Sequence, residues 1–210
     1  MKAKTMLFYS LTMLVAGCIP VLSLQPLFTE QTLVFDEHLL GSWVDDPNQP
    51  TTSWEFTHLQ PADQNMLPEA LKDQRERVYR LNVHDKDNHR GAFIACLVKL
   101  DNGLFLDVFP ATFPSGQTNE EKMPLMYNCF FFVPGHTFIK VETIADRLRM
   151  RLTDDDKFKE LAGAEPNMVP FESVDNRPIL TASTEDLQAF VTKYANDDRL
   201  FPNKVVLKRK

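Results

Sequence analysis

One row of charged side chains has a spacing that points to anion binding. Arg147, Arg149 and Arg151 stand at alternate positions of a β-patterned run, so their guanidinium groups share one face of the strand. Turned inward, the row would bind a carboxylate or phosphate group through paired N–H donors. Turned outward, it would form a charged ladder beside Lys140 and Glu142 of the preceding strand. Apolar residues between the arginines favour the outward arrangement, and the three arginines are kept as candidate anion-binding residues.

A second group of polar residues is close together in the chain. His84, Asp85, Asp87 and His89 fall within six residues, and imidazole and carboxylate groups are metal ligands. Their spacing lacks both the alternating oxygens and glycine of a calcium loop and the paired spacing of a zinc site. Aspartates in a turn commonly bond to their own backbone. The sequence therefore predicts a solvated hairpin turn and no metal site.

Three further residues have alternatives that the sequence leaves open. Cys96 and Cys129 both fall in predicted strands, and they form either a disulfide or two buried thiols, with the thiols favoured. Asp107 lies between apolar neighbours. It either points to solvent, which is the default for a carboxylate, or is a buried partner for a basic group.

No catalytic constellation has local support in this sequence. We find no Ser-His-Asp, Cys-His or paired-carboxylate pattern, and seven glycines leave little material for a phosphate loop. We therefore predict no catalytic residues and no cofactor. A hydrolase-like enzyme that uses His84, His89 or His136 in a surface cleft is the alternative, because catalytic groups assemble in space.

Composition and charge limit the partners. The chain is 43% hydrophobic and 25% charged, which is typical of a folded globular protein. Its net charge is −6, and it becomes −8 without Lys2 and Lys4. A phosphate backbone is a poor partner for such a chain, so we expect no binding to nucleic acid.

The amino terminus has the pattern of a secretory signal. Lys2 and Lys4 precede an apolar run over residues 6–16. The run is too short to span a bilayer, which requires about 20 apolar residues. It ends in Val15-Ala16-Gly17-Cys18, which resembles the lipobox of bacterial lipoproteins. An ordinary secretory signal with an incidental cysteine is the alternative.

The lipobox resemblance implies a division of the chain. Residues 1–17 would be a cleaved lipoprotein signal peptide, and Cys18 would become the lipid-bearing first residue. Residues 18–32 would form the anchor and a short tether along the domain surface, and residues 33–210 a single β-rich domain. Ile19 after the cysteine implies the outer membrane, facing the periplasm, if the bacterium has two membranes.

Most of the mature chain alternates short β-patterned runs with turn signals. In the clearest run, residues 53–59, Trp54 and Phe56 share one face. The first predicted strand opens at Gly41. The remaining predicted strands cover 77–84, 92–100, 104–109, 127–133, 137–144 and 147–153. About eight strands in a meander are expected to close into an antiparallel barrel, because closure removes the unpaired edges.

The last quarter of the chain changes to helical patterns. Asp154 is the predicted N-cap of a short helix over 156–162, and Ser183 caps a second helix over 184–195. An apolar stripe on the second helix is expected to pack against the barrel. Residues 205–207 are a candidate final strand.

The first strand opens with Gly41-Ser42-Trp43, which resembles the Gly-x-Trp that begins lipocalin-like barrels, where the tryptophan plugs one end. The order of about eight strands followed by a carboxy-terminal helical segment is also similar. No basic residue placed to cover Trp43 is evident, and the strands are short for a deep calyx. With the lipobox and the run 136–142, the pattern resembles a group of bacterial envelope lipoproteins with a lipocalin-like barrel. That resemblance transfers no active site.

These observations predict a membrane-anchored protein of the bacterial cell envelope that acts as a non-enzymatic binding or scaffold module. Its expected partner is the membrane, through the lipid anchor, together with an envelope protein or an apolar ligand. Besides the hydrolase-like alternative, a lipocalin-type carrier remains, and it requires an apolar cavity of about 300 Å³ or more.

Overall fold

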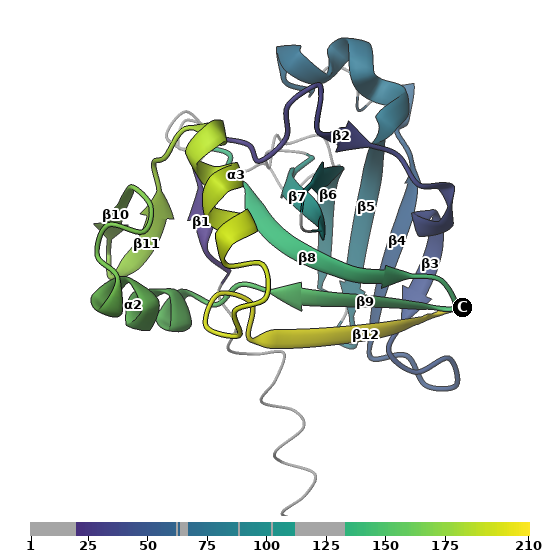
Figure 1. The fold of residues 1–210 in the computed structure, drawn as a ribbon. Coiled ribbons are helices and arrows are strands. Elements are labelled where there is room, and N and C mark those ends of the chain that lie inside the picture. Colours follow the sequence, from purple (N-terminus) through teal and green to yellow (C-terminus); the bar gives the residue numbers. More distant parts are fainter. Residues whose placement is uncertain (1–19, 62, 64–66, 88, 102, 112–132) are drawn as a thin grey trace, which may run out of the picture.

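The alternating pattern folds into a closed antiparallel barrel in a computed structural model, which describes residues 20–61, 63, 67–87, 89–101, 103–111 and 133–210 (Figure 1). The barrel strands are β3 (Gly41–Val44), β4 (Thr52–His58), β5 (Val78–Asp85), β6 (Arg90–Leu100), β7 (Gly103–Pro110), β8 (Thr137–Ile144), β9 (Arg147–Leu152) and β12 (Asn203–Arg209). Pairing of β6 with β7 closes the eight-stranded ring. The predicted fold class, a mainly β, lipocalin-like barrel, is confirmed.

The final strand completes the barrel. β12 lies between β9 and β3 and pairs with both in antiparallel fashion. The sequence predicted this strand only as an addition and assigned the eighth place to residues 127–133. Most of that predicted strand lies in 112–132, outside the described residues. Long-range pairing of the chain's last residues with its first barrel strand is not visible in a local pattern.

The inward face of the barrel is filled with apolar side chains. One buried cluster contains Leu39, Trp43, Phe56, Tyr79, Leu81, Ala95, Leu97, Leu106, Val108, Ile139, Val141, Leu148, Met150 and Leu207. These residues come from all eight strands and from the short helix η2 (Glu37–Leu39). The barrel therefore has the packed interior of a small barrel rather than an open calyx along this length.

Trp43 is buried inside the barrel, as part of its apolar interior. The ring is fully buried, and its Nε1–H donates to the Leu39 carbonyl at 2.8 Å. The Arg209 guanidinium lies 4.6 Å from the ring centre and donates to the carbonyls of Leu40 and His38. The expectation that no basic residue covers Trp43 is therefore wrong. Pairing of β12 with β3 places Arg209 opposite Trp43, although the two are far apart in sequence.

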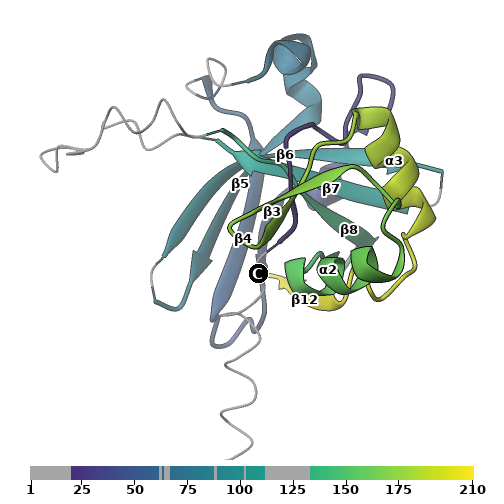
Figure 2. The same cartoon turned by 90° about the vertical axis from the view of Figure 1, so that its left-hand side faces the viewer.

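Helices and a small sheet cover one side of the barrel (Figure 2). They are α2 (Asp155–Ala164), α3 (Thr184–Lys193), β1 (Leu22–Ser23), β10 (Phe171–Val174) and β11 (Arg177–Leu180). Both predicted N-caps are confirmed, because Asp154 accepts from the Lys157 N–H and Ser183 from the Asp186 N–H. On other sides, η4 (Glu69–Arg77) precedes β5, and β2 (Leu33–Val34) pairs with β6.

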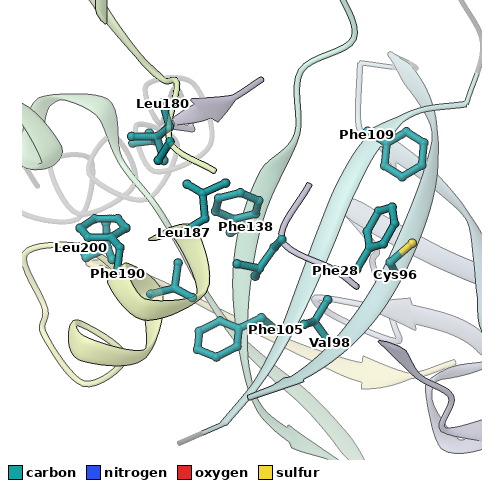
Figure 3. Packing of buried hydrophobic residues seen from close by; sticks show 14 of the residues in the cluster. Phe28, Cys96, Val98, Phe105, Phe109, Phe138, Leu180, Leu187, Phe190 and Leu200 are labelled. Atoms are coloured by element: carbon teal, nitrogen blue, oxygen red, sulfur yellow. The ribbon is translucent and has the colours of Figure 1, made fainter. Parts of the chain in front are cut away.

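A second apolar core fills the space between the barrel and this covering layer. Phe105 and Phe109 on β7, with Phe138 on β8, point away from the barrel interior into this core, to which α3 contributes Leu187 and Phe190 (Figure 3). Phe28 packs among them. Because β6, β7 and the start of β8 are buried on both faces, any polar side chain on these strands must find a partner inside the protein.

Candidate functional site

The segment 21–28, which we call the strap, lies between the barrel and the covering layer. The Val21 N–H donates to Thr153 Oγ1 at 3.1 Å, just beyond the end of β9. Ser23 and His136 exchange two backbone hydrogen bonds of 2.8 and 2.9 Å. Val21 and Leu27 are buried. The strap is thus packed more deeply than the surface tether that we expected.

The other side of the strap is bound to the covering layer. The Leu24 N–H donates to the Leu180 carbonyl at 3.0 Å. From α3, the Thr184 hydroxyl donates to the Pro26 carbonyl and the Gln188 amide to the Leu27 carbonyl, each at 2.8 Å. The strap therefore joins the two layers of the protein by hydrogen bonds to both.

Asp107 is the buried centre of this arrangement. Its carboxylate has no solvent exposure, and it accepts from the Leu27 N–H and from His136 Nδ1–H, both at 2.7 Å. The exposure to solvent expected for Asp107 is wrong: the side chain is buried and is the partner of a basic group, His136. The strap and α3 cover the outer face of β7, so an outward-pointing residue on this strand is enclosed. Burial of a carboxylate is costly unless it is paired and hydrogen-bonded.

His136 and Cys96 complete the polar cluster. The His136 ring lies between Phe109 and Phe28, with centroid distances of 4.8 and 6.2 Å. Cys96 faces Asp107 across the β6–β7 pair and is a free, buried thiol. Burial, and then the Asp107 charge, raise the pKa of Cys96, which keeps the thiol protonated and unreactive. Cys129 lies outside the described residues.

The histidines of the enzyme alternative are not brought together. His89 is exposed in the turn between β5 and β6, and His84 lies on β5. His136 is buried beneath the strap, and two strands separate β5 from β8 in the sheet. His136 is hydrogen-bonded to Asp107 rather than directed toward the other two. The three side chains therefore do not line one cleft.

The β5–β6 turn is a hydrogen-bonded polar turn. Asp85, Asp87 and His89 have ligand-type atoms within 4.8 Å of one another, whereas His84 is not part of this group. One Asp85 oxygen accepts from the backbone N–H groups of Asp87 and His89, and the other bonds to His89 Nδ1 at 2.8 Å. The Asp85 hydrogen bond raises the pKa of His89. These bonds within the turn match the solvated hairpin turn that the sequence predicts.

The arginine row faces outward. Leu148 and Met150 point into the barrel, and Arg147 and Arg149 are exposed. Arg151 differs, because segment 198–201 covers it. Its guanidinium forms ion pairs with Glu142, at 2.9 Å, and with Asp198, and it donates to the Phe201 carbonyl. The inward alternative, with an anion inside the barrel, is therefore wrong.

Replacement of Arg151 by alanine is expected to lower the free energy of unfolding by about 1.5–3 kcal/mol. The variant removes charge-assisted hydrogen bonds from a largely buried site. Arg149→Ala on the same strand is the matched control, and it should change the free energy by less than about 0.5 kcal/mol because its side chain is exposed. Urea unfolding of both variants measures the difference, and equal effects would contradict the different burial of the two arginines.

The fold and this site together define a class: a packed lipocalin-like barrel with a covering helical layer, held together by an amino-terminal strap. No family model, curated protein or solved structure matches this chain. Among the residues that the structure describes, no helix has both the length and the apolar character needed to cross a bilayer.

Proposed function

We propose that this protein is a lipid-anchored, non-enzymatic binding or scaffold module of the bacterial cell envelope. The observation that carries the proposal is the strap. Val21 is the first buried residue in the part of the chain that the structure describes, and Cys18 is three residues earlier in the sequence. Three extended residues span at most about 10 Å. A lipid on Cys18 would therefore hold the barrel directly at the membrane surface. In that position the barrel could bind a partner in the envelope.

The arrangement of buried polar and apolar side chains favours the binding role over the hydrolase-like enzyme and the lipocalin-type carrier. Asp107 and His136 hold the strap, so the most deeply buried polar pair is engaged in structure. The barrel interior is packed, which disfavours a carrier with a deep calyx. A hollow outside the barrel, at the start of β10, is lined by Pro166, Asn167, Val169, Pro170 and Phe171. An envelope protein is accordingly the favoured partner, ahead of an apolar ligand. The proposed location is the outer membrane, facing the periplasm, in a bacterium with two membranes.

Cys18→Ser tests the anchor. We expect the variant either to accumulate as an uncleaved precursor or to leave the membrane fraction, because serine cannot carry the thioether-linked lipid. Immunoblots of soluble and membrane fractions measure both outcomes. Cys129→Ser, the same change at another cysteine, is the control and should fractionate like the parent. A Cys18→Ser protein of mature size that stays in the membrane fraction would reject the proposal.

A further inference from the structure

The outer surface of β9 and β12 gathers positive charge on an acidic chain. Cross-strand pairing places Arg147 opposite Lys208, Arg149 opposite Val206, and Arg151 opposite Lys204. The residues between them point into the barrel, so these six share the outer surface. We call the exposed part of it, namely Arg147, Arg149, Lys204, Val206 and Lys208, the basic face. It lies on a chain whose net charge is −6.

The charges of the basic face are poorly compensated within the protein. Arg147 has one distant ion pair, at 3.8 Å, with the exposed Asp146. Arg149 and Lys208 have no ion pair with any residue that the structure describes. Arg147 and Lys208 directly oppose each other, and like charges in this position destabilise a sheet. Arg151 is excluded from the face, because it is committed to Glu142 and Asp198. An external anion would relieve the repulsion.

The basic face is next to the point where the strap begins. Val21 is bonded to Thr153, and Thr153 directly follows β9. Three extended residues separate Cys18 from Val21, so these two residues lie within about 10 Å of each other. The six residue steps from Thr153 back to Arg147, at the far end of the basic face, span about 20 Å of strand. β9 and β12 lie side by side along the lower edge of the molecule in Figure 1, and η4 lies at the opposite edge.

We propose that the basic face lies on the anionic phospholipid headgroups of the membrane that holds Cys18. This inference rests on the proposed lipid anchor, and it adds the orientation: β9 and β12 toward the bilayer, η4 away from it. A bilayer is favoured over an acidic protein because the chain between Cys18 and Val21 is too short to carry the face far from the membrane. Val206 lies at the centre of the face and is 45% exposed. Because its side chain is uncharged, it can contact the headgroup layer without breaking an ion pair. An acyl anchor combined with basic residues is a known means of strengthening membrane attachment.

The test uses the full lipidated chain on vesicles of neutral phosphatidylcholine, with or without anionic phosphatidylglycerol. A fluorophore is attached at Val206→Cys or, as the control on η4, at Arg75→Cys, in a Cys129→Ser background. The vesicles carry a nitroxide quencher on the headgroups. We expect quenching at position 206 on anionic vesicles and little quenching at position 75. About 1 M salt should abolish the quenching at 206, because the screening length falls to about 3 Å.

Charge-reversal variants test which basic residues contact the anionic headgroups. Each basic residue near an anionic surface strengthens binding about five-fold, so Arg147→Glu/Arg149→Glu/Lys208→Glu should abolish the quenching at position 206. The control Arg75→Glu/Lys86→Glu/Lys99→Glu makes the same change of charge at exposed sites elsewhere and should keep the quenching.

The experiment tests the lipid anchor on Cys18 and the membrane contact of the basic face separately. Protein that stays on the vesicles at high salt supports the anchor, and protein that is released there refutes it. Retained protein whose position 206 is unquenched on anionic vesicles overturns the inference, as does stronger quenching at position 75. If the protein is released at high salt, its binding to anionic vesicles only at low salt still supports the membrane contact of the basic face. Absence of binding at low salt refutes that contact.

Discussion

Asp107→Ala is expected to lower the free energy of unfolding by about 3–5 kcal/mol. The variant leaves the Leu27 N–H and the His136 imidazole without their common acceptor inside the protein. Removal of one member of a buried polar pair has this cost because the remaining partners stay desolvated. Chemical denaturation measures the loss. Limited proteolysis should also cut the variant earlier within residues 21–28, because Asp107 holds the strap at Leu27.

Two variants make the Asp107 result specific. Asp107→Asn should lose less stability than Asp107→Ala, because the amide oxygen still accepts from one of the two donors. Asp101→Ala, at an exposed turn between β6 and β7, should change stability by less than about 0.5 kcal/mol. An Asp107→Ala protein that is as stable as the parent, with an unchanged cleavage pattern, would show that the buried carboxylate does not hold the strap.

Trp43→Ala is expected to cost about 3–5 kcal/mol, the usual range for removal of a fully buried aromatic side chain. The variant also removes the surface on which the Arg209 guanidinium stacks. Thermal or urea unfolding measures the effect. A loss below about 1 kcal/mol would contradict the burial of the ring inside the barrel.

Trp43→Phe separates the packing of the ring from its hydrogen bond. Phenylalanine keeps most of the buried aromatic surface but loses the bond from Nε1–H to the Leu39 carbonyl. The expected loss is about 1 kcal/mol, the typical net contribution of one hydrogen bond. If both variants cost the same, the stabilisation that Trp43 provides comes from its hydrogen bond rather than from its packing.

The elements whose signals are local could be predicted from the sequence. The strand at 137–144 matches β8, and the alternation at 53–59 matches β4 within a residue at each end. Asp154 and Ser183 cap their helices because a side-chain oxygen meets a free N–H within one turn. The hairpin of β10 and β11 was missed. Its turn, Asp175-Asn176, has positive φ at both residues, and Asp and Asn tolerate this conformation, so a signal was present.

The features that depend on contacts between distant segments could not be predicted. Arg209 covers Trp43 only because β12 pairs with β3. Asp107 is buried only because the strap and α3 cover the outer face of β7. A single strand pattern cannot show that its polar side will be enclosed by other parts of the chain. The outward direction of the arginine row could be predicted, because the apolar alternation of the same strand determines it.

Mass spectrometry of the protein purified from its native cells tests the central claim most directly. The account predicts a mature chain that begins at Cys18 and carries the added mass of a diacylglyceryl group, with the first 17 residues absent. An intact and unmodified leader, or a mature chain that begins at another residue, would contradict the lipid anchor and the orientation derived from it.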